Sequence, residues 1–288
     1  MYGVVTRNEE ETTWAEFDIG FYEVKDVSGR SSEPIADAVS MISCFGDNAA
    51  VKENSDLCPV TPDGLRATRE RTYFDWAYIC PTHDGYRRGL LEIVEDCAVV
   101  NPDVRLDDIG FPRPEYCYCD RCNERFESWV RTNHERGEGP PPEETTIDDR
   151  YEWRADVITN FVREATDRIP GKTYMTLYPD PYGDHLYERA GIDLEAVEPH
   201  IDEFVVPLYD THYGTTYWLE TIAKGFESRL GTPFSIELYA VNVEIDNLIH
   251  AVEVANEYAE SVLFGYDASN ARAALRRMDA DAREGVEW

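Results

Sequence analysis

The chain has 288 residues, of which 42% are hydrophobic and 12% aromatic, so it can bury a substantial core and is too aromatic for an acidic disordered chain. Asp and Glu number 58 against 27 Lys and Arg, and the net charge of −31 argues against nucleic acid binding, because phosphate contacts need clustered basic residues. No apolar run approaches the roughly 20 residues of a membrane span, and the N-terminus lacks the basic and apolar regions of a signal peptide. We therefore expect a cytoplasmic protein that binds neither nucleic acid nor membrane.

Only a handful of the basic residues are lysines. Strong acidity with few lysines is typical of halophilic proteins, which work in molar salt, where the Debye length falls to roughly 3 Å and self-repulsion is screened. The acidity therefore predicts the salt concentration in which the protein works and not the ligand that it binds. Seven cysteines without a signal peptide indicate reduced thiols or metal ligands rather than a disulfide framework.

Short β-branched or aromatic runs alternate with longer stretches of helical periodicity, with no internal repeat and no linker between two halves. This rhythm is typical of βα units around a parallel sheet. The eight expected strands are Met1–Val5, Ser40–Phe45, Tyr73–Cys80, Val104–Ile109, Thr173–Tyr178, Glu203–Tyr209, Pro233–Tyr239 and Ser261–Tyr266. Phe17–Val24 is an alternative to one of the first two. Eight strands separated by helices predict a single α/β domain over residues 1–288, a (β/α)₈ TIM barrel.

Apolar stripes at helical spacing mark three segments, Tyr86–Val99, Tyr151–Ile169 and Asp246–Ala259, as helices. The segment His134–Arg150 contains three consecutive prolines among acids, which predicts an exposed loop. Asn48–Gly64 is expected to be another long loop after a strand. In such barrels, the loops that follow the strands build the active site.

The most specific motif is Cys117-Tyr-Cys119-Asp-Arg-Cys122, which brings three thiols within six residues. Thiolates at this spacing can bind one tetrahedral Zn²⁺, with each sulfur about 2.3 Å from the ion. Cys80 and Cys58 are the candidates for the fourth ligand, and Cys80 is favoured because the end of strand three lies beside the loop after strand four. A site of four cysteines has no open position, so the zinc would be structural. The alternative is four unrelated free thiols.

Charged residues end the fourth expected strand, Val104-Arg105-Leu106-Asp107-Asp108. Alternation assigns Val104 and Leu106 to the helix-facing side, so Arg105 and Asp107 point into the barrel mouth. Charge pairing with Arg105 would hold Asp107 ionised.

The seventh expected strand, by the same alternation, turns Glu237 and Tyr239 inward. A buried acid is costly unless it is paired or functional. Glycoside hydrolysis needs two carboxyl groups, one to protonate the leaving oxygen and one to attack the sugar or activate water. The catalytic candidates are therefore Glu237, Asp107 and Asp108. The structural alternative is an Arg105–Asp107 ion pair that closes the barrel, with Glu237 hydrogen-bonded to tyrosines.

Aromatic side chains surround the same expected mouth, and flat rings with a polar tip suit sugar faces and hydroxyl groups. Barrel cores also use tyrosine, so each ring alone could equally be packing. The substrate-binding candidates are Arg105, Tyr78, Tyr178, Tyr209, Tyr239, His212 and Trp218.

The stretch from Cys80 through the cysteine motif to Trp129 resembles family 42 glycoside hydrolases, β-galactosidase-type barrels in which one upstream cysteine and a Cys-x-Cys-x-x-Cys motif bind zinc. The resemblance implies that Cys80, Cys117, Cys119 and Cys122 are the ligands. Glu237 matches the position of the family's nucleophile, whereas the family's Asn-Glu at the end of strand four is here Asp107-Asp108.

Two further segments, Arg105–Asp108 and Val206–Tyr209, look more like uncharacterised glycosidase-like barrels related to α-amylases. Together these features predict a glycosidase that acts on a small-molecule or oligosaccharide substrate. The alternatives are a non-catalytic barrel that binds a glycan or a partner, with a structural zinc, and a hydrolase or lyase for another polar metabolite. A homo-oligomer is compatible with the sequence.

Overall fold

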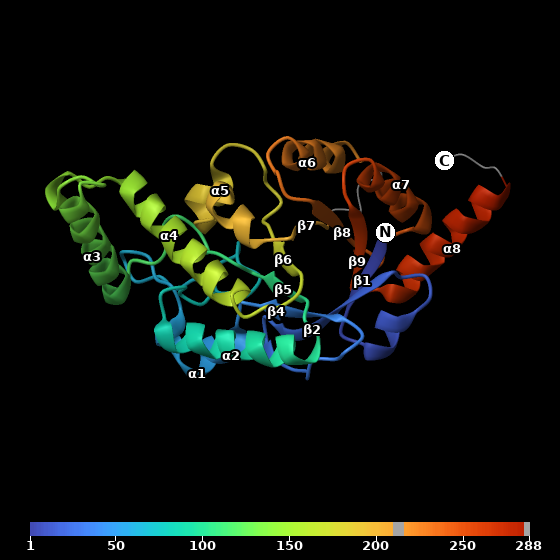
Figure 1. Ribbon diagram of the computed structural model, residues 1–288, viewed down its shortest axis with the longest axis horizontal. Coiled ribbons are helices and arrows are strands. Elements are labelled where there is room, and N and C mark those ends of the chain that lie inside the picture. The colour runs from blue at the N-terminus through green and yellow to red at the C-terminus, as the bar shows by residue number, and fades with distance from the viewer. Residues whose placement is uncertain (210–215, 285–288) are drawn as a thin grey trace.

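The protein forms a closed barrel of parallel strands in the computed structural model, which describes residues 1–209 and 216–284 (Figure 1). Nine strands form one sheet, and all of them except β3 are parallel and close into a ring because β1 pairs with both β2 and β9. The strands are β1 (Tyr2–Thr6), β2 (Ile19–Asp26), β3 (Gly29–Arg30), β4 (Val39–Ser43), β5 (Val104–Asp107), β6 (Thr173–Thr176), β7 (Glu203–Leu208), β8 (Phe234–Tyr239) and β9 (Ser261–Gly265). This confirms the predicted (β/α)₈ barrel.

Helices surround the strands, and α3 lies outermost, beyond α4, on the left of Figure 1. The α-helices are α1 (Asn48–Glu53), α2 (Asp84–Val100), α3 (Asp120–Arg136), α4 (Ile147–Thr166), α5 (Leu194–Val197), α6 (Tyr217–Glu227), α7 (Ile245–Asn256) and α8 (Ala268–Glu284). Short 3₁₀ turns cover Glu9–Thr13, Ser55–Leu57, Pro142–Glu144 and Glu198–His200, and a π-helical turn covers Leu186–Ala190. None of the helices in the described ranges combines the length and apolar character that a membrane span requires.

The strand predicted over Tyr73–Cys80 is wrong. These residues belong to the long connection between β4 and α2, where a single bridge joins Tyr78 to Gly46. The place in the barrel beside β4 is taken by β2, which contains most of the alternative Phe17–Val24. One strand was therefore missed and one wrongly counted, so β5 and β8 are still the fourth and seventh strands of the barrel.

The predicted proline-rich loop is shorter than His134–Arg150, because helices enter it from both sides. Gly137 ends α3 in a left-handed conformation (φ 75°), and a capping box between Thr146 and Asp149 begins α4. The segment Asn48–Gly64 also contains α1, whose N-terminus is capped by the Asp47 side chain.

Two apolar layers hold the barrel. The larger one fills the space between strands and helices, and the smaller one fills the barrel itself. The inner layer consists of Val5, Phe21, Val39, Met41, Tyr174, Val205 and Leu263. Phe21 packs edge-on against Tyr174 with ring centroids 5.0 Å apart. Charged side chains lie on either side of this layer, Glu203 beside Lys172 at one end and Arg105 with Glu237 toward the other.

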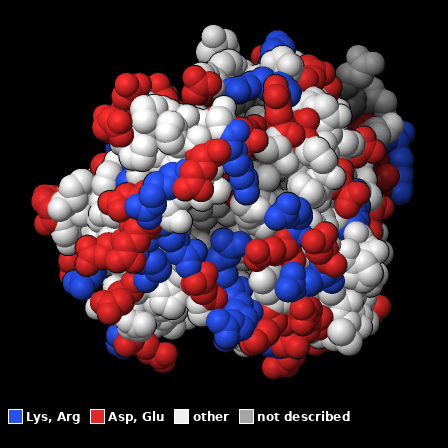
Figure 2. All heavy atoms as spheres, turned by 60° about the vertical axis from the view of Figure 1, so that its left-hand side comes forward, with Lys and Arg blue, Asp and Glu red and all other residues white. Residues whose placement is uncertain are grey.

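Acidic side chains spread over the face shown in Figure 2, with basic side chains among them. The negative charge on this face is thus distributed over several elements rather than gathered at one site.

Candidate active site at the barrel mouth

A buried ion pair joins the carboxyl ends of β5 and β8. Arg105 is fully buried, with its guanidinium carbon 5.6 Å from the ring centre of Phe21 and its Nε donating to Thr176 Oγ1 at 3.0 Å. Its Nη1 lies 2.6 Å from Glu237 Oε2, as an ion pair rather than an aligned hydrogen bond, and its Nη2 lies 3.6 Å from Asp107 Oδ2. One guanidinium group therefore contacts both carboxylates.

Glu237 lies beneath a layer of tyrosine rings and is 0% exposed. The Tyr209 hydroxyl donates to its Oε1 at 2.6 Å, and the Tyr209 ring lies 5.4 Å from that of Tyr239. Any side chain at Gly265 would come within 3.0 Å of the same carboxylate oxygen. The hydrogen bond from a tyrosine agrees with the structural alternative, which did not include the ion pair of Glu237 with Arg105. Asp107, with 14% of its side chain exposed, is the member of the trio that opens to the mouth.

Asp108 turns away from the strand because its backbone is left-handed (φ 50°). Its Oδ2 lies 2.5 Å from the Ser43 hydroxyl. Burial, and then the neighbouring charge of Asp107, raises the pKa of Asp108 to about 7. The two consecutive aspartates thus occupy different surroundings, one against a guanidinium group and one against a serine.

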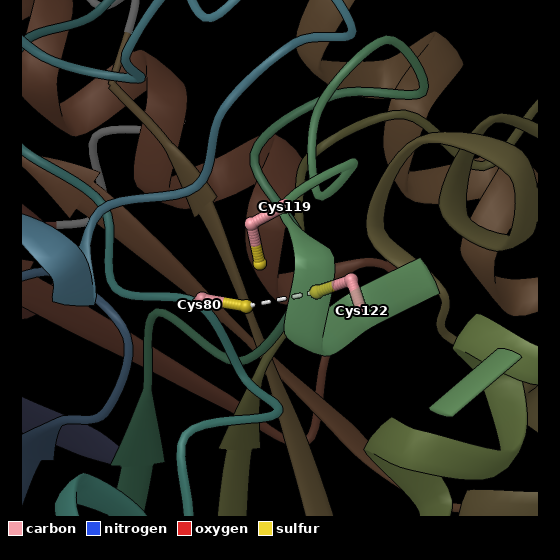
Figure 3. A group of neighbouring side chains, drawn as sticks. All are labelled: Cys80, Cys119 and Cys122. Carbon is pink, nitrogen blue, oxygen red and sulfur yellow. Dashed lines mark hydrogen bonds between the residues drawn. The ribbon is translucent and has the colours of Figure 1, made fainter. Parts of the chain in front are cut away.

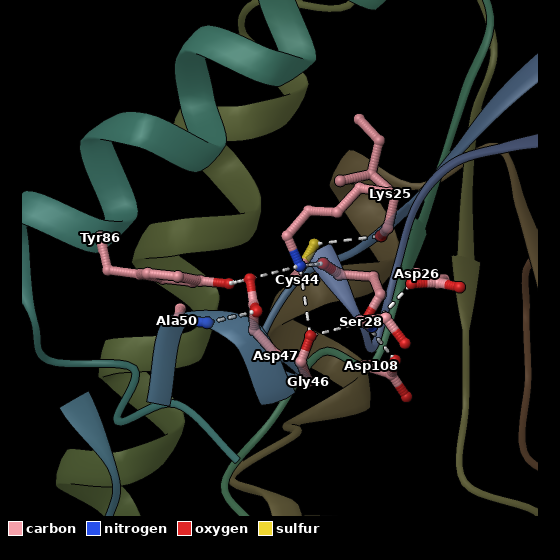
Figure 4. Close-up of polar contacts among 11 residues, drawn as sticks. Lys25, Asp26, Ser28, Cys44, Gly46, Asp47, Ala50, Tyr86 and Asp108 are labelled. Atoms are coloured by element: carbon pink, nitrogen blue, oxygen red, sulfur yellow. Dashed lines mark hydrogen bonds and ion pairs between the residues drawn. The ribbon is translucent and has the colours of Figure 1, made fainter. Parts of the chain in front are cut away.

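A buried lysine, Lys25, binds the backbone of Gly46, next to Asp108 (Figure 4). Lys25 Nζ donates to the carbonyl oxygens of Ser43 at 2.7 Å and Gly46 at 3.2 Å, and lies 3.3 Å from Asp47 Oδ2. The Tyr86 hydroxyl donates to the same Asp47 oxygen at 2.8 Å. A bulge in β2 between Glu23 and Lys25 shifts the register against β4 at this point. Bulges commonly re-aim side chains beside functional sites.

A second ion-pair group at the mouth was not predicted from the sequence. Arg7 pairs with Glu23 and, at 3.0 Å, with Asp26. Burial raises the pKa of Glu23, and the hydrogen bond from Arg7 opposes that rise. Glu23 sits in the middle of β2, so only a correct placement of the second strand could have indicated that it faces the barrel.

The end of β6 carries a compact polar group. Asp180 Oδ2 lies 2.5 Å from His185 Nδ1, and His185 Nε2 lies 3.5 Å from Arg189 Nη1. The Arg189 guanidinium stacks on the ring of Tyr178, 3.9 Å from its centre. Tyr178 was predicted to offer its ring to a sugar, but this face of the ring is occupied by Arg189.

The other predicted ligand contacts are dispersed. Tyr78 packs on Phe74 and Trp76 in the β4–α2 connection, with ring centroids 5.1 and 5.8 Å away. Trp218 lies in the first turn of α6, half-buried against the core. His212 lies outside the described residues.

Four cysteines converge beside the mouth, and three of them, Cys80, Cys119 and Cys122, are drawn in Figure 3. The sulfur atoms of Cys80, Cys119 and Cys122 lie within 4.8 Å of one another and could hold a metal ion. Cys80 Sγ lies 3.3 Å from Cys122 Sγ and 3.8 Å from Cys117 Sγ. A tetrahedral ion about 2.3 Å from each sulfur separates its ligands by about 3.8 Å, so these spacings fit a metal with little rearrangement. Hydrogen bonds from the other three thiols lower the pKa of Cys80 well below its ordinary value.

Cys58, the alternative fourth ligand, stands apart from this cluster, because its sulfur is directed at the carbonyl oxygens of Pro59 and Ala67, 3.6 and 3.5 Å away. Cys117 has a left-handed backbone (φ 68°), and its carbonyl oxygen accepts a hydrogen bond of 2.7 Å from the buried Arg150. Helix α4 therefore holds the loop that presents the thiols.

No protein-family model matches the chain, and no curated protein matches it by sequence. Solved structures do share its fold. α-L-fucosidase isoenzyme 2 from Paenibacillus thiaminolyticus superposes with a TM-score of 0.64 at 11% identity, over 98% of this chain and 49% of that one.

An inactive variant of the GH20 exo-β-N-acetylglucosaminidase from Vibrio harveyi superposes with a TM-score of 0.52 at 9% identity, over 93% of this chain and 50% of that one. The GH36 α-galactosidase AgaA from Geobacillus stearothermophilus superposes with a TM-score of 0.50 at 8% identity, over 98% of this chain and 42% of that one. The chain thus spans about half the length of these proteins or less, and at such identities the likeness shows a shared barrel fold.

Proposed function

We propose that the chain is a glycoside hydrolase-like enzyme whose reacting groups are the two aspartates at the end of β5. The observation that carries the proposal is the difference between them. Asp107 contacts Arg105 and opens to the mouth, whereas burial raises the pKa of Asp108 to about 7, so that the group is partly protonated near neutral pH. Two carboxyl groups in contrasting surroundings are the usual basis of acid and base roles in glycosidases.

In this proposal Asp107 is the carboxylate that faces the sugar carbon, and Asp108 is the group that donates a proton to the leaving oxygen. Glu237, which the sequence favoured as nucleophile, has both oxygens occupied by Tyr209 and Arg105. Its proposed role is to fix the Arg105 guanidinium beneath Asp107. That three proteins sharing the fold are glycosidases by name supports the reaction class but not the sugar or the linkage.

The test is hydrolysis of a panel of 4-nitrophenyl glycosides by the full chain. We expect Asp107→Asn to reduce kcat/KM by roughly 10²-fold or more, since it removes a group that acts on the reacting atom. Asp56→Asn, at an exposed position of the 3₁₀ turn Ser55–Leu57, should leave kcat/KM unchanged. Equal activity of Asp107→Asn and the unmodified protein would overturn the assignment.

Glu237→Gln distinguishes a Glu237 that positions Arg105 from a Glu237 that is itself a reacting group. If Glu237 fixes Arg105, its loss leaves a buried guanidinium with a weaker partner and should lower the free energy of unfolding by about 3 kcal/mol together with activity. A variant of full stability and no activity would instead restore Glu237 as the reacting group.

A second candidate function, a barrel that binds glycans without cleaving them, is favoured by the enclosure of Glu237. It predicts saturable binding of a sugar with no turnover by concentrated protein over days. Cleavage of any glycoside that is lost in Asp107→Asn excludes it.

We propose that the metal of the cysteine cluster is zinc, bound by Cys80, Cys117, Cys119 and Cys122. Four thiolates fill the tetrahedral coordination that Zn²⁺ prefers and leave no position for substrate, so the zinc would be structural. Its role would be to fasten the first turn of α3 to the β4–α2 connection.

A further inference from the structure

We infer that Arg189, at the carboxyl end of β6, is the recognition group for an anionic substituent of the sugar, a carboxylate or a phosphate ester. The inference rests on the proposed function, since it names the class of sugar that the mouth would accept.

The guanidinium group of Arg189 has two side-chain contacts. It lies on the ring of Tyr178, 3.9 Å from the ring centre, with Nη1 3.5 Å from His185 Nε2. Asp180 faces the other ring nitrogen of His185 at 2.5 Å, which places the proton on Nδ1 and leaves Nε2 as the acceptor for Arg189. Arg189 lies on the π-helical turn Leu186–Ala190, a rare geometry that is frequent at functional sites.

The groups that hold Arg189 do not neutralise it. Its direct partners are a tyrosine ring and the lone pair of a histidine, and among the described residues no carboxylate lies within 4.0 Å of its guanidinium nitrogens, although the chain has 58 acidic against 27 basic residues. The backbone carbonyl of Arg189 accepts a hydrogen bond of 2.6 Å from the buried Arg154, which ties the π-helical turn to helix α4. A guanidinium held by a ring face and an imidazole, with no carboxylate of the described residues in direct contact, is preorganised for bidentate binding of a planar or tetrahedral anion.

Arg189 also lies close to the proposed reacting groups. The residue after it, Ala190, accepts a hydrogen bond of 2.9 Å at its carbonyl oxygen from the backbone N–H of Phe111, three residues after Asp108. In keeping with this, burial and then the charge of Asp108 raise the pKa of Tyr78, and the charge of Arg189 opposes that rise. An anion bound by Arg189 would therefore lie on the same side of the barrel as the chain that follows Asp108.

Three matched sugars test the inference: glucose, glucuronate and glucose 6-phosphate, titrated into the full chain at fixed ionic strength by calorimetry or ligand-observed NMR. We expect both or one of the anionic sugars to bind at least roughly 10-fold more tightly than glucose, in keeping with a charge-assisted bidentate contact. Arg189→Gln should remove this difference, and Arg189→Lys should restore part of it. The control is Arg113→Gln, because Arg113 also lies over a tyrosine, Tyr73, at 4.7 Å but is already paired with Glu115 at 2.8 Å.

Dependence on Arg189 for glucuronate alone identifies a uronate, and dependence for glucose 6-phosphate alone identifies a phosphate ester. Equal binding of glucose and both anionic sugars, binding of none of them, or anion preference that survives Arg189→Gln would overturn the inference. Because the readout is binding, it is independent of the proposed hydrolysis, which fails instead if Asp107→Asn leaves turnover unchanged.

Discussion

The hydroxyl of Ser43 has a single hydrogen and two acceptors, Asp108 Oδ2 at 2.5 Å and the Gly46 carbonyl at 3.1 Å. When Asp108 is ionised, the hydrogen is directed at its carboxylate. When Asp108 is protonated, it can donate to Ser43, whose hydrogen then turns to Gly46, beside the Lys25 ammonium group. Each protonation state of Asp108 thus has its own complete set of hydrogen bonds, which suits a residue that must both release and regain a proton.

The raised pKa of Asp108 can be tested by replacing this residue and measuring how the free energy of unfolding changes with pH. The native pKa of about 7 lies above the ordinary value of 3.8, so between these values the folded chain keeps a proton that the unfolded chain has released, and stability falls as the pH rises through this range. Asp108→Asn removes this loss. Its free energy of unfolding relative to the unmodified protein should rise by roughly 2–4 kcal/mol from pH 4 to pH 8.

Urea unfolding at pH 4.5, 6 and 8 measures this difference. For the exposed Asp56→Asn the difference should stay constant with pH. A constant difference for Asp108→Asn as well would mean that Asp108 has an ordinary carboxyl pKa.

Strand alternation is a local property, and it indicated the residues that meet at the mouth on β5 and β8. It could not indicate that Arg105 contacts Glu237 more closely than Asp107, because that depends on the distance between two strands far apart in the chain. Nor could it find Arg189, which lies outside the strands on the π-helical turn Leu186–Ala190.

At the scale of the elements, the first turn of α3 is fastened by the thiol cluster rather than by a side-chain cap, since Cys119 occupies the capping position without making a capping hydrogen bond. The cysteine motif predicted that Cys80, Cys119 and Cys122 come together, which is confirmed, although the strand assigned to Cys80 was wrong. A motif of three cysteines constrains its own geometry, whereas the aromatic run over residues 73–80 resembles a strand only in composition. Its buried side chains, among them Phe74, Ala77 and Ile79, pack as an irregular connection instead.

Removal of one thiol should release this end of the helix. We expect protein purified without added metal to contain about one zinc per chain, and Cys119→Ser to lose most of it, with faster amide hydrogen exchange in α3 and lower stability but little change in kcat. Elemental analysis and exchange mass spectrometry measure the two effects.

Cys58→Ser is the matched control, because its sulfur contacts only backbone carbonyls and it should keep full zinc content. Loss of zinc in Cys58→Ser, or far less than one zinc per chain in the unmodified protein, would contradict the proposed ligand set.

At the scale of the whole molecule, a net charge of −31 opposes the compact state. The free energy of unfolding should therefore increase when KCl is raised from about 0.1 M to 2 M, as the Debye length falls from roughly 10 Å to a few ångströms. Urea unfolding at several KCl concentrations measures the effect. Substituting choline chloride at equal ionic strength separates screening from specific ion binding, and unchanged or reduced stability in both salts would contradict the salt-adapted interpretation.

Closure of the barrel depends on β1, which pairs with β2 on one side and with β9 on the other, Tyr2 lying opposite Val262. During synthesis the N-terminal strand emerges early, yet one of its edges has no partner until residues 261–265 have left the ribosome. Contacts of such large sequence separation slow folding, and an unpaired strand edge is a site for association with other chains. Protection of that edge until the last strand arrives is therefore the step at which assembly of this barrel is most exposed to aggregation.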